Sequence, residues 1–204
     1  MWQPTEEQIN NSQMMDYMQL VNQKFGLSLK KYLQLYDWSI IKAEDFWGLF
    51  WEYSKIIHHS PYTKVVDSLT KMPGAKWFEG TTLNFTENLL RHRDNKIAIR
   101  FHGEDGEQSS LTYKELHDQV SGLAHSMREM GIVKNDRVAG FMPNIPETII
   151  TMLATASIGA IWSSCSPDFG IKGVLDRFQQ IEPKLIFAAD GYLYNGKTII
   201  AFPN

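Results

Sequence analysis

RVAGFMPNIPETIITMLATASIGAIWSSC, residues 137–165, is the stretch that decides the fold class. Its apolar beginning, Arg137 to Met142, predicts a strand, and Ala160 to Ser163 predicts another. The residues between them predict a helix over 147–158, with Pro146 in the first turn, a favoured place for proline. This helix is apolar nearly all round, so we expect it to be buried. A strand, a buried helix and a second strand favour two parallel strands joined by a crossover.

The same alternation continues on both sides of this stretch. Upstream, residues 96–102 predict a strand that turns at Gly103–Gly106 into a short strand at Leu111. Thr112 and Glu115 then form a capping box, which opens an amphipathic helix that stops at Gly131. Downstream, a strand at 184–188 follows a helix with apolar residues at Ile171, Val174, Leu175, Phe178 and Ile181. We therefore predict an α/β fold with a mainly parallel sheet and helices on both faces.

Residues 1–90 read as a separate segment that is helical and rich in aromatic residues. Thr5 and Gln8 fit a capping box, which predicts a helix over residues 6–25 that stops near Gly26. A second helix, predicted over 43–58, carries one aromatic face formed by Trp47, Phe50 and Trp51, with Ser54 one turn on. That face favours packing on a larger body, and a surface for stacking a ligand is the alternative. Residues 91–204 form the second predicted domain.

Composition excludes several classes of function. The chain has 204 residues and a net charge of -3, so it carries no basic field that would attract nucleic acid or anionic lipid. Cys165 is the only cysteine, which excludes an intrachain disulfide and a cysteine-rich zinc site. The longest apolar stretch, near residues 149–162, is too short and too interrupted to span a membrane. We expect a cytoplasmic protein with no nucleic-acid or membrane partner.

Candidate chemistry is sparse, and each candidate has a structural alternative. The sequence contains neither a dinucleotide-binding fingerprint nor a Walker A motif. His58 and His59 point in different directions on a helix and lack a nearby acid, which argues against a metal site. The segment 162–170, which contains Cys165, lies between a predicted strand and a helix, where α/β sheets bind ligands. A tight turn capped by Asp168 explains the same residues, and a catalytic cysteine would need a histidine that the segment lacks.

Five short motifs follow one another along the chain. They are PGAKWF (73–78), LNFTENLL (83–90), LTYKEL (111–116), DRV (136–138) and MPNIPE (142–147). Together they resemble the adenylate-forming acyl-CoA synthetases, and this resemblance extends to about Lys197. IWSSCSPDFG, residues 161–170, is similar to the branch of that family that activates acetoacetate. An acetyl- or propionyl-CoA synthetase is the alternative parent.

The resemblance implies a ligase that uses ATP, Mg²⁺ and CoA to convert acetoacetate, or another short-chain acid, into its CoA thioester. It also implies that residues 91–204 are the first, incomplete part of the adenylate-forming domain. The phosphate-binding loop ending in Pro-Lys and the catalytic lysine of the family are absent from these 204 residues. We therefore expect the chain alone to be inactive, with no catalytic residue, no metal site and no tightly bound cofactor. A natural truncation, a shifted reading frame or a cloned piece would each explain it, and the missing remainder of the enzyme is an expected partner.

The resemblance also implies a limited set of binding residues. Relatives contact CoA through arginines in the stretch that corresponds to residues 190–197, where this chain has Tyr194 and Lys197 instead. The segment that lies against CoA in relatives corresponds to Ser163, Ser164, Cys165 and Ser166. A solvated charge is the alternative role for Lys197. Two further hypotheses remain open for the whole chain: a non-catalytic CoA-binding module, or a gene remnant without function.

Overall fold

The computed structural model describes residues 2–200. The chain forms two compact units, Met1–Leu83 and Asn84–Asn204, and each unit has a buried core of its own. No helix among residues 2–200 is both long and apolar enough to cross a membrane.

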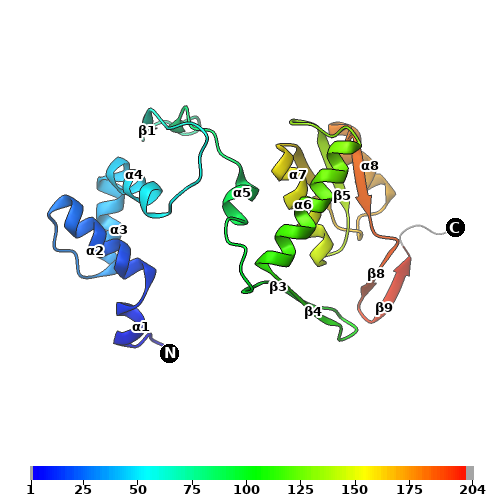
Figure 1. The fold of residues 1–204 in the computed structure, drawn as a ribbon, viewed down its shortest axis with the longest axis horizontal. Coiled ribbons are helices and arrows are strands. Elements are labelled where there is room, and N and C mark those ends of the chain that lie inside the picture. The colour runs from blue at the N-terminus through cyan, green and yellow to red at the C-terminus, as the bar shows by residue number, and fades with distance from the viewer. Residues whose placement is uncertain (1, 201–204) are drawn as a thin grey trace. The chain divides into compact units, whose positions relative to one another are not determined.

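Helices make up most of the first unit (Figure 1): α1 (Glu6–Asn10), α2 (Gln13–Phe25), α3 (Tyr32–Ile41) and α4 (Ala43–Tyr53). The prediction of a single helix over residues 6–25 is wrong, because the chain breaks between α1 and α2. Ser12 is extended, and its hydroxyl accepts a hydrogen bond from the amide of Met15 at 3.2 Å, which caps a new helix. The predicted stop at Gly26 is confirmed, since Gly26 adopts a left-handed conformation with φ of 66°.

The core of the first unit is formed by α2, α3 and α4. Its buried side chains are Tyr17, Met18, Val21, Leu35 and Leu49. Helix α4 ends at Tyr53, five residues before the predicted end at 58, and it packs on two sides. Phe46 faces the ring of Tyr17 at a centroid distance of 5.4 Å, whereas Trp51 stacks on Phe78 at 4.5 Å. Packing therefore accounts for Phe46 and Trp51, whereas Trp47 and Phe50 remain 40% and 39% exposed.

Strands β1 (Lys64–Val66) and β2 (Trp77–Glu79) form a small antiparallel pair next to α4 in the first unit. Asp67 organises the loop between the two strands. Its carboxylate accepts hydrogen bonds from the Lys71 ammonium at 2.5 Å and from the Lys76 amide at 2.8 Å. These two bonds lower the pKa of Asp67 to about 2.

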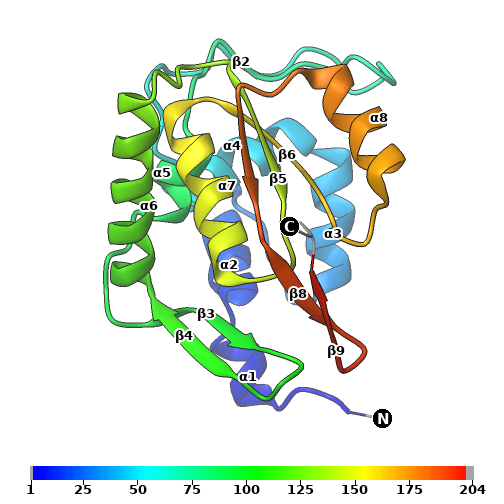
Figure 2. The ribbon, with the colours of Figure 1, turned by 90° about the vertical axis from the view of Figure 1, so that its right-hand side faces the viewer.

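The second unit alternates helices and strands. Its helices are α5 (Phe85–Leu89), α6 (Tyr113–Glu129), α7 (Pro146–Ile158) and α8 (Ile171–Ile181). Its strands are β3 (Ile97–His102), β4 (Gln108–Thr112), β5 (Arg137–Phe141), β6 (Ile161–Cys165), β7 (Leu185–Ala188), β8 (Gly191–Tyr194) and β9 (Lys197–Ile200). Strands β5, β6 and β7 form a parallel sheet in the order β6-β5-β7, with Ala139 opposite Ser163 and Ile186. Figure 2 shows this sheet with α6 and α7 on one side and α8 on the other.

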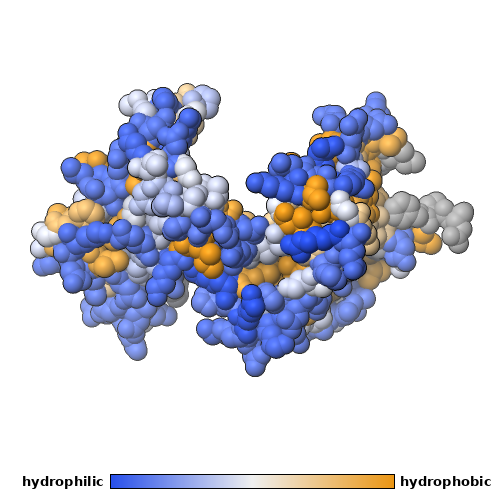
Figure 3. All heavy atoms as spheres, turned by 45° about the horizontal axis from the view of Figure 1, so that its top comes forward, coloured by the Kyte–Doolittle hydropathy of each residue, from blue (hydrophilic) through white to orange (hydrophobic). Residues whose placement is uncertain are grey.

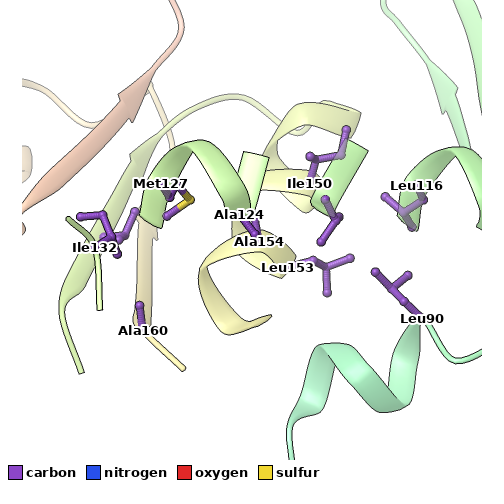
Figure 4. Close-up of a cluster of buried hydrophobic side chains, with 11 residues drawn as sticks. Leu90, Leu116, Ala124, Met127, Ile132, Ile150, Leu153, Ala154 and Ala160 are labelled. Atoms are coloured by element: carbon purple, nitrogen blue, oxygen red, sulfur yellow. The ribbon is translucent and has the colours of Figure 1, made fainter. Parts of the chain in front are cut away.

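Neighbouring residues of the central strand β5 face opposite layers. Val138 is fully buried in the cluster made with α6 and α7, in which Leu153 is also fully buried. The next residue, Ala139, is fully buried in a second cluster with Cys165 and Phe178 of α8. Figure 4 shows the first cluster, including Leu116, Ile150 and Leu90. The predicted fold class, a mainly parallel sheet covered on both faces, is confirmed.

Local signals explain where most of these elements begin and end. Both hydrogen bonds of the capping box between Thr112 and Glu115 are present at the start of α6. The predicted hairpin at Gly103–Gly106 joins β3 to β4. The second hairpin, β8–β9, was not predicted, although its turn has a strong sequence signal: Asn195 and Gly196 adopt φ angles of 51° and 71°. An Asn-Gly pair favours such a turn because both central residues need positive φ.

Apolar side chains remain exposed on both units. Figure 3 shows apolar patches that interrupt the hydrophilic surface of each unit. In the second unit, strands β6 and β7 pair only with β5 among the described residues. Ile161 of β6 and Ile186 of β7 are 51% and 49% exposed. Each outer strand therefore leaves an edge with exposed apolar side chains.

Candidate functional site

Strand geometry divides the predicted serine-rich binding segment between two faces of the sheet. Residues 161–165 form β6, so successive side chains point to opposite faces. Cys165 belongs to the cluster that faces α8, and Ser163 shares that face with it. Ser164 lies on the other face with Trp162, which packs against the α6–α7 cluster. Ser166 follows the strand and is exposed. Ser163 and Ser164 therefore cannot meet one ligand on the same face.

Cys165 lies in the core and is only 6% exposed. Burial raises the pKa of its thiol, and the positive charge of Arg177 opposes this effect in part. A raised pKa disfavours the thiolate, which is the reactive form of cysteine. This environment supports a packing role for the side chain.

The loop after β6 is connected to strand β8 through Asp168. The Ser166 hydroxyl donates a hydrogen bond to the Asp168 carboxylate at 2.9 Å. Burial raises the pKa of Tyr192, and the hydrogen bond between its hydroxyl and the Asp168 carboxylate raises it further. Asp168 was predicted as a cap, but it does not cap α8: Gly170 holds the N-cap position without a side-chain bond. Asp168 thus connects Ser166 with Tyr192 of the β8–β9 hairpin. Sequence spacing does not predict this connection.

Tyr194 and Lys197 lie opposite each other beside the turn of the β8–β9 hairpin. Both side chains are exposed, and no ion pair involves Lys197 within residues 2–200. The amide of Gly196, in the turn between them, donates a hydrogen bond to the Glu104 carboxylate at 3.3 Å. The turn of the β8–β9 hairpin is thereby tied to the turn of the β3–β4 hairpin.

The second unit also contains an open cleft of about 1210 Å³ near the C-terminal ends of β5 and β7. Open α/β sheets bind ligands in this position. The cleft is lined by the turn of the β3–β4 hairpin, the loop 143–147 and the β8–β9 hairpin. None of the six predicted binding residues lines it; Tyr192 does. The sequence contained a signal for this cleft, because the loops that follow β5 and β7 both come after parallel strands. The prediction did not recognise that these two loops line one cleft.

The cleft is acidic, which decides what it can hold. Five carboxylates line it: Glu104, Asp105, Glu107, Glu147 and Asp190. His102 is the only lining side chain that could carry a positive charge. A polyphosphate would be repelled there, so the residues present do not fit the phosphates of ATP or CoA. Within residues 2–200 no group of three or more His, Cys, Asp or Glu side chains is arranged to hold a metal ion.

Comparison with protein families assigns both parts of the sequence. Residues 85–200 match the AMP-binding enzyme family, and residues 32–89 match the N-terminus of acetyl-coenzyme A synthetase.

Individual relatives match nearly the whole chain. The acetoacetyl-CoA synthetase of Macaca fascicularis is 45% identical over 202 residues, which is 97% of this chain and 30% of the relative. The acetoacetyl-coenzyme A synthetase of Rhizobium meliloti (strain 1021) is 48% identical over 197 residues, with the same coverage. The structure of acetoacetyl-CoA synthetase from Streptomyces lividans superposes with a TM-score of 0.89 at 38% identity, covering 98% of this chain and 31% of the other. The chain thus spans about 30% of the length of the curated relatives that it matches.

Proposed function

This chain belongs to the AMP-binding enzyme family, and on that premise we propose that it is the N-terminal part of an acetoacetate–CoA ligase. The reaction of the whole enzyme would be ATP + acetoacetate + CoA giving acetoacetyl-CoA + AMP + diphosphate. One observation carries this proposal: relatives named acetoacetyl-CoA synthetases match 97% of the chain, across both of its units. Acetate or propionate as the acid is the alternative.

The chain would contribute scaffold and part of the CoA surface to the whole enzyme. Lys197 is an exposed cation without an ion pair among the described residues, so it could bind a phosphate group of CoA. Tyr194 lies beside it and offers an aromatic ring, and Ser166 offers an exposed hydroxyl. Because Ser163 and Ser164 lie on opposite faces of β6, one CoA molecule would contact at most one of them, and Cys165 would support the strand from inside. Mg²⁺ and ATP would be bound by parts of the enzyme outside these residues.

The reaction needs positive charge and hydrogen-bond donors at the phosphates, because negative charge develops on oxygen atoms in both steps. The cleft of this chain supplies carboxylates instead. We therefore expect the 204-residue chain alone to bind no cofactor tightly and to form no acetoacetyl-CoA. The purified chain, incubated with ATP, Mg²⁺, acetoacetate and CoA, would be analysed for the thioester. Formation of acetoacetyl-CoA above the level of a no-protein control would refute this expectation.

A chimera tests whether the chain is a working part of such a ligase. The corresponding segment of the Streptomyces lividans enzyme would be replaced by residues 1–197 of this chain. We expect acetoacetate-dependent release of AMP, whereas the same enzyme without the segment should release none. A soluble, folded chimera without activity would count against the proposal. Because the acid preference of the chimera would follow the relative, identifying the acid requires a full-length ligase that begins with this sequence, assayed with acetoacetate, acetate and propionate.

A non-catalytic CoA-binding module is the second candidate, and the unpaired charge of Lys197 is the observation that favours it. Calorimetric titration of the chain with CoA separates the two. Saturable binding that Lys197→Ala weakens would support the module. Heats of injection that do not saturate would rule out the CoA-binding module and favour the role as part of a ligase.

A further inference from the structure

The outer face of the β3–β4 hairpin carries a set of hydrogen-bonding side chains that the proposed function does not use. From Ile99 onward the strands alternate: Ile99 and Phe101 are half-buried, whereas Arg100 and His102 are exposed. Across the hairpin, Arg100 pairs with Ser110 and His102 pairs with Gln108. Paired residues lie on the same face of a two-stranded sheet. One face therefore presents a guanidinium, an imidazole, an amide and a hydroxyl together.

A hollow adjoins this face, and no acidic residue lines it. A depression of about 350 Å³ lies against the hairpin, lined by Arg100, His102, Gln108 and Ser110 together with Ile97, Phe101 and Ser109. The acidic residues of the neighbouring turn, Glu104, Asp105 and Glu107, line the larger cleft instead. Figure 2 shows the hairpin at the edge of the second unit, below α6. The two hollows that share this hairpin thus differ in charge.

Arg100 has no ion pair or hydrogen bond through its side chain within residues 2–200. Other cations around it do have partners: Lys96 pairs with Asp94 at 3.6 Å, and Lys114 pairs with Asp118 at 2.7 Å. The guanidinium group has a planar arrangement of donors that matches two oxygen atoms of a phosphate group. Ser110 and Gln108 can add neutral hydrogen bonds from the opposite strand.

We propose that this face of the hairpin is a binding site for a phosphate group. Arg100 supplies the charge, and Ser110 and Gln108 complete the hydrogen bonds. This site contains none of the carboxylates of the acidic cleft and does not include Lys197, although the two hollows share Phe101, His102 and Ser109. It does not depend on the ligase assignment. The phosphate would be either a free ion or the terminal phosphate group of a nucleotide such as the 3′-phosphate of CoA.

Nuclear magnetic resonance tests the site with inorganic phosphate as the probe. The ¹⁵N-labelled 204-residue chain would be titrated with sodium phosphate at constant ionic strength. We expect saturable shifts of the Arg100 side-chain Nε–H and of the Ser110 and Gln108 amides. Arg100→Gln should weaken binding about tenfold, the loss expected for one charge-assisted hydrogen bond, and Arg100→Lys should weaken it less.

Arg93→Gln is the matched control, because Arg93 is exposed but lies outside the depression. It removes the same charge and should bind phosphate like the unmodified chain. Shifts that never saturate, or equal weakening by Arg93→Gln, would overturn the proposal. If the site is present, binding of CoA and of dephospho-CoA is compared in the unmodified chain and in Arg100→Gln. A preference for CoA that Arg100→Gln removes assigns the 3′-phosphate, and the absence of such a preference assigns a free anion.

Discussion

A glycine in the central strand makes room for a side chain of the neighbouring strand β6. A Cβ atom added at Gly140 would lie 2.5 Å and 2.6 Å from two ring atoms of Trp162 on β6. Trp162 is half-buried against the main cluster, so its ring has little room to move. Atoms in a packed core cannot approach this closely without strain.

Gly140→Ala should therefore destabilise the chain by about 1–3 kcal/mol, the usual cost of overpacking. Urea unfolding followed by tryptophan fluorescence measures the change. Gly122→Ala is the matched control: a Cβ there meets no atom within 4 Å, and the residue lies in helix α6. Alanine should stabilise that helix by about 0.5–1 kcal/mol. Effects of the same sign at the two positions would contradict this account.

The buried phenol of Tyr17 links stability to alkaline pH. Its hydroxyl donates a hydrogen bond to the Phe46 carbonyl at 2.7 Å, and burial raises its pKa well above the ordinary value of a tyrosine. In the unfolded chain the group ionises near pH 10. Its contribution to stability is therefore complete below about pH 10 and is lost as the pH rises above that value.

Tyr17→Phe should remove this part of the loss of stability at alkaline pH. At neutral pH it should lower the free energy of unfolding by about 1 kcal/mol, because the hydrogen bond to Phe46 is lost. Thermal unfolding between pH 8 and about 11 would compare the two proteins. Tyr32→Phe, at a site that is 57% exposed, controls for the loss of one phenol. An unchanged alkaline slope in Tyr17→Phe would refute the assignment.

At the scale of elements, the short helix α5 depends on side chains that reach α7. Asn84 caps α5 by accepting a hydrogen bond from the Glu87 amide at 3.1 Å. The same side chain donates hydrogen bonds to the carbonyls of Ala156 and Ser157 at 2.9 Å and 3.3 Å. Thr86, which is buried, adds a bond from its hydroxyl to the Leu153 carbonyl at 2.9 Å. One asparagine therefore serves both the start of one helix and the end of another.

Two substitutions at Asn84 separate these roles. Asn84→Ser keeps an oxygen that can cap α5 but cannot reach α7, so it should cost about 1 kcal/mol. Asn84→Ala loses both roles and should cost about 2 kcal/mol. Chemical denaturation gives both values. If the serine and alanine variants were equally stable, the cap would contribute nothing.

The elements show which structural facts the sequence predicts. Helix α6 was predictable because its cap, its apolar spacing and its stop at Gly131 are all local signals. The break at Ser12 was missed although it has a local signal: the residues between Ile9 and Met14 are all polar, and Ser12 is a favoured N-cap residue. In the site, the run Ser163–Ser166 could be located in the sequence, but its division between two faces follows from strand geometry. The contact from Asp168 to Tyr192 is tertiary and has no local signal.

At the scale of the whole molecule, the open edges of the parallel sheet govern solution behaviour. Ile161 and Ile186 are half-exposed on strands that pair only with β5 among the described residues. Unprotected strand edges with apolar side chains promote association between copies. We therefore expect the chain to associate as its concentration rises.

Ile186→Lys should reduce this association, because a charge on an edge strand opposes pairing. Light scattering across a concentration series measures the effect, and circular dichroism confirms that the fold is retained. Leu33→Lys is the matched control: Leu33 is 66% exposed but lies on helix α3 of the first unit and not on a strand. Equal improvement by both substitutions would show that general solubility, and not the edge, is responsible.

The burial of the only cysteine gives the molecule an internal reporter. The Cys165 thiol lies beneath Phe178 of α8, so a thiol-specific reagent can modify it only when α8 moves off the sheet. The rate of modification of the unaltered chain would therefore measure how often this one layer opens. Phe178→Leu should speed labelling by loosening that layer, whereas Leu49→Ala, in the separate core of the first unit, should leave the rate unchanged. Local opening of α8 could thus be followed over time without introducing any foreign probe.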